Sequence, residues 1–154
     1  MLLKIFQFVA WEKEEVLTDI FGDTVMIVKT NGFLEEYYEG SLNGKYVIGQ
    51  ELMTQLDNLS EDMNGDYYLY DTTEADLIID FVENCVKLTK SPFYGKPMKL
   101  MEFQKAYISA LYGFKMKDGR NRFKKSLFLI SRKNGKSELC SALGISSFII
   151  GNEG

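Results

Sequence analysis

The residues best suited to chemistry form one short run, Ser131-Arg132-Lys133-Asn134-Gly135-Lys136-Ser137. A loop that binds phosphates needs converging backbone N–H groups, a lysine that reaches the phosphate oxygens, and a hydroxyl that binds Mg²⁺. Gly135, Lys136 and Ser137 supply these in order. The usual first glycine of such a loop is missing, because position 130 is Ile. The alternative is a basic surface turn in which Ser137 is an ordinary helix start.

The segments on both sides of this run favour the phosphate-binding interpretation. The stretch 126–130 is Ser-Leu-Phe-Leu-Ile, and its apolar residues are typical of a strand buried on both faces of a parallel sheet. The stretch 138–150 has a helical pattern, so a helix N-terminus would point at the bound anion. The sequence therefore predicts a strand, a loop and a helix of an α/β fold over 126–150.

The residues before this unit predict a mainly helical region. Residues 1–30 are expected to be β or mixed structure, with a strand at 24–28 between turn signals. Apolar residues at helical spacing predict helices at 33–38, 50–59, 72–89 and 101–112. Asp71 is the expected N-cap of the third helix, with Glu74 completing a capping box.

Charge is distributed unevenly along the chain. Residues 1–83 carry 4 Lys/Arg and 18 Asp/Glu, whereas residues 84–154 carry 14 Lys/Arg and 4 Asp/Glu. A basic second half suggests an anionic partner such as a nucleotide or a nucleic acid. The alternative is that the two halves neutralise each other in the folded protein.

Composition excludes several kinds of site. The chain has no histidine and only two cysteines, Cys85 and Cys140, so neither a zinc site nor histidine-based acid–base catalysis is expected. Both cysteines lie on apolar helical faces and are expected to be buried thiols. No apolar stretch approaches the roughly 18 residues of a membrane helix, and the N-terminus lacks the features of a signal peptide.

The run 131–137 resembles the variant Walker A loop of the terminase large subunit, the DNA-packaging ATPase of tailed bacteriophages. That family replaces the first loop glycine and carries an arginine early in the loop, here Arg132. The segment 93–105 is similar to the part of the family in which a glutamine recognises adenine, here Gln104. The resemblance covers about residues 33–154.

The resemblance implies a fold and a division of the chain. The expected fold is α/β: an α-rich N-terminal region followed by the first βα unit of a P-loop NTPase sheet, an incomplete ATPase fold. Residues 1–30 would be an unassigned segment. Residues 31–154 would form the N-terminal part of a terminase-like ATPase domain, with a helical region at 50–113 and the phosphate-loop unit at 126–150.

The resemblance also implies roles for site residues, with ATP and Mg²⁺ as cofactors. Gln104 lies off the apolar stripe of its helix, so its amide is expected to be free for adenine, whose N7 and N6 need a donor and an acceptor. Arg132 and Lys136 would act in catalysis on the γ-phosphate. The residues that would bind the nucleotide beside Gln104 are Arg132, Lys133, Asn134, Gly135, Lys136 and Ser137, and the Ser137 hydroxyl would hold Mg²⁺.

The complete subunit of that family uses ATP hydrolysis to drive viral double-stranded DNA into procapsids. The implied partners are the portal protein, the small terminase subunit and further copies in an oligomeric ring. The implied location is the cytoplasm of the infected bacterial host, transiently at the procapsid portal. The basic residues Arg120, Arg122, Lys124 and Lys125 are candidates for contacts with DNA phosphates or for a solvated loop.

Two parts of the family pattern are missing from these residues. After Ser137 the only acids are Glu138 and Glu153, and neither follows an apolar strand as a Walker B Asp-Glu pair does. The carboxylate cluster of the nuclease domain is also missing. We therefore expect no ATP turnover by this fragment alone. Two alternatives stay open: a non-enzymatic interaction module or decoy that binds terminase or portal components, and a fragment of a helicase-like ATPase.

Overall fold

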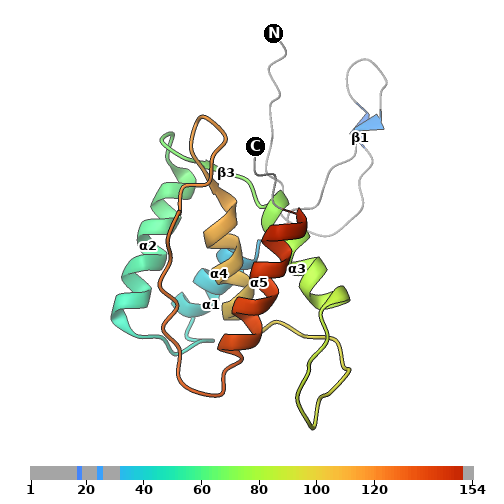
Figure 1. Ribbon diagram of the computed structural model, residues 1–154. Helices are drawn as coiled ribbons and strands as arrows, with labels where there is room; N and C mark the ends of the chain where they lie inside the picture. The colour runs from blue at the N-terminus through green and yellow to red at the C-terminus, as the bar shows by residue number, and fades with distance from the viewer. Residues whose placement is uncertain (1–16, 19–23, 26–31, 151–154) are drawn as a thin grey trace.

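The computed structural model describes residues 17–18, 24–25 and 32–150, and this part of the chain is mostly helical (Figure 1). Its five helices are α1 Phe33–Leu42, α2 Gln50–Asn64, α3 Thr73–Cys85, α4 Glu102–Gly113 and α5 Lys136–Ile150. Two short antiparallel ladders complete the described elements. They pair β1 Leu17–Thr18 with β2 Thr24–Val25, and β3 Leu69–Tyr70 with β4 Phe114–Lys115.

The predicted parallel sheet is absent from the described residues, so the expectation of an α/β sheet at 126–130 is wrong for this structure. The segment 126–130 joins no ladder. Leu127 and Leu129 are 79% and 80% exposed, whereas Phe128 stacks on Tyr107 of α4 with ring centroids 4.4 Å apart. The physical reason is that a strand is buried on both faces only when neighbouring strands and covering helices are present.

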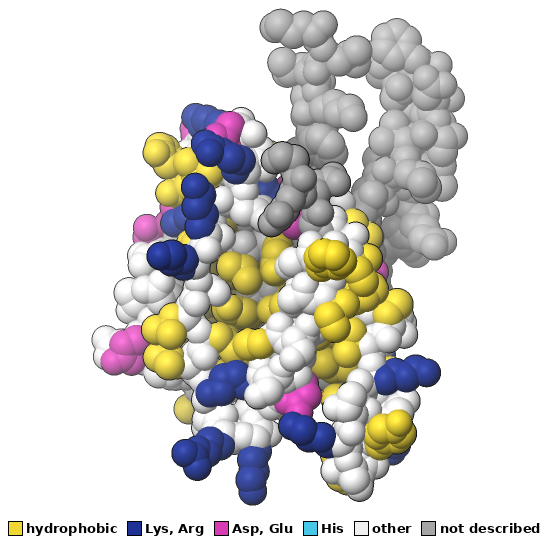
Figure 2. Space-filling model, viewed as in Figure 1, with side chains coloured by type: hydrophobic (Ala, Val, Ile, Leu, Met, Phe, Trp, Pro, Cys, Tyr) yellow, Lys and Arg dark blue, Asp and Glu magenta, His cyan; other side chains and the backbone are white. Residues whose placement is uncertain are grey.

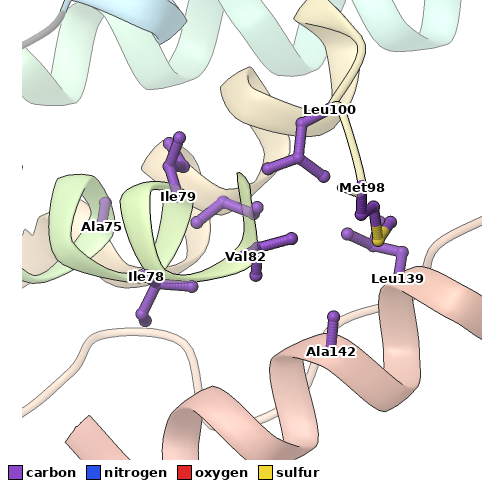
Figure 3. Close-up of a cluster of buried hydrophobic side chains, with 9 residues drawn as sticks. Ala75, Ile78, Ile79, Val82, Met98, Leu100, Leu139 and Ala142 are labelled. Atoms are coloured by element: carbon purple, nitrogen blue, oxygen red, sulfur yellow. The ribbon is translucent and has the colours of Figure 1, made fainter. Parts of the chain in front are cut away.

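Helix α4 lies at the centre of the core, because α1 and α3 both pack directly against it, while α2 packs on α1 and α5 packs on α3. On one side, α3, α5 and the segment before α4 form an apolar cluster with Ile108 of α4. Figure 3 shows side chains of this cluster from three parts of the chain: Ala75, Ile78, Ile79 and Val82 of α3, Met98 and Leu100, and Leu139 and Ala142 of α5. This cluster fixes α5, and with it the loop before α5, against α3 and α4.

A second cluster lies on the other side of α4, between α1, α2 and β4. Its buried members are Leu34, Tyr37, Leu56, Ala106 and Phe114. Arg122 covers this cluster: its guanidinium carbon lies 3.8 Å from the Tyr68 ring centroid, and its Nη1 lies 2.6 Å from Asp62 Oδ2. Arg122 lies in the segment between β4 and α5. Its contacts therefore hold the start of that segment against the end of α2.

Most predicted helices are confirmed, with shifted ends. Helix α1 continues past Gly40, where a side chain would meet the Tyr46 ring at 2.5 Å. Helix α2 runs to Asn64, and α3 ends at Cys85 instead of 89 because the chain turns into a hairpin. Residues 24–25 of the predicted strand pair as expected, and residues 26–28 lie outside the described part.

The N-cap of α3 is Thr72 and not the predicted Asp71, and the predicted capping box is not formed. Asp71 Oδ1 accepts hydrogen bonds from the Thr73 backbone N–H at 3.0 Å and from the Thr73 hydroxyl at 2.6 Å. Glu74 instead forms an ion pair with Lys115 of β4. Asp71 therefore stabilises the helix start alone, and the Glu74 side chain ties α3 to β4.

The Glu83 side chain is expected to stabilise the fold, because it connects α3 to the start of α4. Its carboxylate accepts hydrogen bonds from the Leu100 backbone N–H at 3.0 Å and from Lys105 Nζ at 2.9 Å. Burial raises the pKa of Glu83, but these bonds and the Lys105 charge outweigh burial and hold the pKa below its ordinary value. Its contribution is therefore complete above about pH 4.5 and is lost as pH falls.

Glu83→Gln should lower the free energy of unfolding by about 1–3 kcal/mol at pH 7, as measured by urea denaturation. The difference from the unmodified protein should shrink as the pH falls from the ordinary glutamate pKa through the lowered pKa of Glu83, below which both side chains are neutral. Glu51→Gln, on the exposed start of α2, is the matched control and should change stability by less than about 0.5 kcal/mol. An equal loss at neutral and acidic pH would show that the charge of Glu83 does not contribute.

Candidate nucleotide-binding site

Residues 131–135 form a compact loop immediately before α5. Lys133 and Gly135 both have left-handed backbone conformations, with φ of 68° and 70°. The Asn134 side-chain amide donates to Ser131 Oγ at 2.6 Å, and Lys136 Nζ donates to the Ile130 carbonyl at 3.1 Å. The lysine thus spans the loop from the first residue of α5 back to the residue before Ser131.

The loop lies at a helix N-terminus, where backbone N–H groups and the helix dipole favour anions. The first helical hydrogen bond runs from the Leu139 N–H to the Gly135 carbonyl at 2.8 Å, so the earlier N–H groups of α5 have no carbonyl partner of this kind. Lys136 and Ser137 occupy the first two positions of this 15-residue helix and are exposed. An anion approaching the loop would meet both side chains.

Three positively charged side chains belong to the loop and to the first residue of α5. Arg132, Lys133 and Lys136 are all exposed. Figure 2 shows Lys and Arg side chains grouped along the lower edge of the viewed face, and the loop before α5 lies at the same end in Figure 1. The local field therefore suits a polyanion such as a triphosphate.

Glu138 is the acid nearest to the loop in sequence, and it already has a cationic partner. Lys90 Nζ donates to Glu138 Oε1 at 2.8 Å. This bond lowers the pKa of Glu138 below its ordinary value. The carboxylate therefore stays ionised and bound to Lys90, which makes it a poor general base for activating water. No local pattern predicts this pair, since the two residues are 48 positions apart in the chain.

Gln104 lies in contact with the loop, although the sequence expectation for its surroundings is wrong. The residue is buried, with 3% of its surface exposed, and its amide is not free. Gln104 Oε1 accepts the Met101 N–H at 2.9 Å, and Nε2 donates to the Asn134 carbonyl at 3.4 Å. The structure thus joins Gln104 and the loop, as a buried link from α4 to Asn134.

A hollow of about 340 Å³ adjoins the start of α4, close in sequence to Gln104. Tyr37 and Tyr46 stack there with ring centroids 4.8 Å apart, and the Tyr46 hydroxyl donates to Glu102. The residues that line the hollow are Tyr37, Lys45, Tyr46, Val47, Met101, Glu102 and Phe103. No sequence motif predicts this group as a site, because its residues come from two helices and the loop between 43 and 49.

The other sequence candidates fall into two groups. Arg120 pairs with Asp118 in an exposed turn, Arg122 pairs with Asp62 in a partly buried position, and Lys124 and Lys125 are exposed. Cys85 and Cys140 are both exposed, so the expectation of buried thiols is wrong. Cys85 is the last residue of α3. Cys140 lies on the outward side of α5, and the adjacent residue Leu139 is buried in the core.

The described residues contain no cluster of three or more metal-ligating His, Cys, Asp or Glu side chains. Within the same part of the chain, no helix is both long and apolar enough to cross a bilayer. Comparisons of the chain with models of protein families, with curated proteins and with solved structures gave no match.

Proposed function

We propose that residues 131–137 bind the phosphates of ATP together with Mg²⁺, as part of a terminase-like DNA-packaging ATPase. The observation that carries this proposal is the loop itself. It is closed by the Lys136 Nζ bond to the Ile130 carbonyl and lies at the start of a long helix. Glu138, the acid in the first turn of α5, is bound to Lys90. These residues fit a phosphate chain, because positive charge and helix N–H groups meet at one exposed place.

Each loop residue has a proposed role. The backbone around Gly135 and the Lys136 ammonium bind the phosphates, and the Ser137 hydroxyl orients Mg²⁺. Arg132, exposed at the other end of the loop, neutralises charge on the γ-phosphate during cleavage. Lys133 and Asn134 shape the loop. Gln104 contributes by holding the Asn134 carbonyl.

In the complete subunit this site would power translocation of viral double-stranded DNA into a procapsid. The portal protein, the small terminase subunit and other copies of the subunit are the proposed partners, in the cytoplasm of an infected bacterium. The support for this wider function is the ordered resemblance over residues 33–154, together with the contact between Gln104 and the loop.

The Ser137→Ala variant tests whether the Ser137 hydroxyl contributes to Mg²⁺-dependent binding of ATP. In the presence of Mg²⁺, the affinity for ATP measured by isothermal titration calorimetry should fall by roughly 5- to 10-fold, the loss of about one hydrogen bond or ligand interaction. With EDTA instead of Mg²⁺, the variant and the unmodified chain should bind ATP equally. Failure of the unmodified chain to bind ATP at all would refute the site.

The chain itself is expected to bind ATP without turning it over. No described carboxylate other than the Lys90-bound Glu138 lies in the first turn of α5. The measurement is phosphate release by purified residues 1–154. A clear rate of ATP hydrolysis that disappears in Lys136→Ala would contradict this expectation.

A second candidate function is a non-enzymatic docking module for packaging components. The observation that favours it is an apolar surface on the segment 126–130 and on α5. Figure 2 shows hydrophobic side chains on both sides of α5. The exposed members are Leu127, Leu129, Ile145, Phe148 and Ile149. Purified portal or terminase subunits should then bind the chain equally well with and without an intact phosphate loop. Loss of that binding on changing Lys136 would count against docking.

A further inference from the structure

Residues 86–98 form an ordered hairpin that projects from the helical core between α3 and α4 (Figure 1). Three backbone hydrogen bonds close it: the Met98 N–H to the Val86 carbonyl at 2.9 Å, the Leu88 N–H to the Lys96 carbonyl at 2.9 Å, and the Gly95 N–H to the Leu88 carbonyl at 2.8 Å. Met98 anchors its base in the core, with 4% of its surface exposed. The hairpin is therefore a fixed projection.

Two adjacent aromatic rings lie at the tip of this hairpin. Phe93 is 54% exposed and Tyr94 is 78% exposed. Both stand in a stretch, residues 89–97, in which every residue is exposed. The Lys96 ammonium lies 5.6 Å from the Phe93 ring centroid, so a positive charge accompanies the exposed ring. Neither ring contributes to the two apolar clusters of the described structure.

The charge of the hairpin has one sign. Between residues 84 and 101 there is no Asp or Glu, and there are four lysines: Lys87, Lys90, Lys96 and Lys99. All four are exposed. Lys90 is bound to Glu138, which leaves Lys96 beside the Phe93 ring, and Lys87 and Lys99 near the base of the hairpin, for an outside partner. Within the described structure, no ion pair holds these three.

The combination favours nucleic acid over protein as the partner. Protein interfaces are enriched in aromatic residues but depleted in lysine, so lysines around two exposed rings are atypical of them. Sites for single-stranded nucleic acid combine cations that contact the backbone with aromatic faces on which unpaired bases stack. Paired bases in a duplex are stacked on each other and offer no free face to a ring.

We propose that the hairpin 86–98 is a binding element for single-stranded nucleic acid. Phe93 and Tyr94 stack on bases, and Lys87, Lys96 and Lys99 contact phosphates. The inference goes beyond the proposed ATP site and does not depend on it. It does place the nucleic acid beside that site, because Lys90 connects the hairpin to the first turn of α5.

The test is fluorescence anisotropy of a labelled single strand of about 12 nucleotides with the full chain. Replacing Phe93 and Tyr94 together with Ala should weaken binding by at least about 10-fold, since one base stacked on an aromatic ring contributes roughly 1–3 kcal/mol. Tyr67→Ala is the matched control, because Tyr67 is 66% exposed but lies between α2 and β3. It should leave binding unchanged. Thermal unfolding should be the same for all three proteins.

Salt dependence gives a second measurement. The slope of log affinity against log salt should become less steep by about 0.7 for each lysine removed in Lys96→Gln and Lys99→Gln. A duplex of the same length should bind more weakly than the single strand. The proposal is overturned if the unmodified chain does not bind the single strand, if Tyr67→Ala weakens binding as much as the hairpin variant, or if duplex binds equally well and is insensitive to the aromatic changes.

Discussion

Lys136→Ala is expected to lower the affinity of the chain for ATP by at least about 10-fold and to leave its thermal unfolding unchanged. The lysine is the loop cation with a defined position, since its ammonium is held across the loop by the Ile130 carbonyl. A charge-assisted hydrogen bond to a phosphate contributes roughly 1.5–3 kcal/mol, which corresponds to about a 10- to 150-fold change in affinity. Because Lys136 is exposed, its removal leaves no cavity.

Two further variants separate charge from loop shape. Lys136→Gln keeps a donor that can reach toward the Ile130 carbonyl but removes the charge, so it should bind ATP as weakly as the alanine variant. Lys117→Ala removes an exposed lysine from the turn after β4, beyond the far end of α4, and should bind ATP normally. If Lys117→Ala and Lys136→Ala weaken binding equally, the effect is one of net charge and the loop has no specific role.

The helices could be predicted from the sequence because their signals are local. The predicted helix at 101–112 corresponds to α4, Glu102–Gly113, and Gly113 ends it where a side chain would meet the Tyr70 ring at 2.8 Å. The helix after the loop could also be predicted, and it begins two residues earlier than expected, at Lys136. Apolar periodicity and terminal glycines carry this information within a few turns of chain.

The environment of Gln104 could not be predicted, because it depends on several neighbours at once. A single apolar stripe places Gln104 on the outer side of its helix, but α4 is covered on more than one side. Ile108 and Ser109 are buried as well as Ala106. A polar residue off the main stripe is then buried too, and its amide is used by Met101 and Asn134. Buried polar groups need such partners, and the sequence does not name them.

The segment 126–130 shows the limit of a pattern that depends on long-range pairing. Its apolar run is compatible with a strand, but a strand becomes part of a sheet only when another strand provides its hydrogen-bond partners. In the described structure the segment contacts α4 through Phe128 and through the Tyr107–Ser126 hydroxyl pair at 2.6 Å. Its alternate residues, Leu127 and Leu129, stay exposed. The same sequence can therefore occupy an extended conformation with one face packed.

Phe114→Ala should be the most destabilising of the changes considered, with a loss of about 3–5 kcal/mol in the free energy of unfolding. Phe114 is completely buried and packs on Tyr70 with ring centroids 4.8 Å apart. It also lies beneath Arg122, whose guanidinium carbon is 5.4 Å from its ring centroid. Removing the ring leaves a cavity and weakens the attachment of the segment that leads to the phosphate loop. Small domains have only about 5–15 kcal/mol of stability, so much of it would be lost.

Phe148→Ala is the matched control, since the same residue type stands on α5 with 91% of its surface exposed. It should change the free energy of unfolding by less than about 0.5 kcal/mol in urea denaturation at low protein concentration. The change in the free energy of unfolding should also be the same at high protein concentration if the outward face of α5 is exposed to solvent. A loss from Phe148→Ala that grows with protein concentration would mean that this face is buried between molecules in solution. A loss from Phe114→Ala below about 1 kcal/mol would contradict the packing of the second cluster, and with it the attachment of Arg122 above that ring.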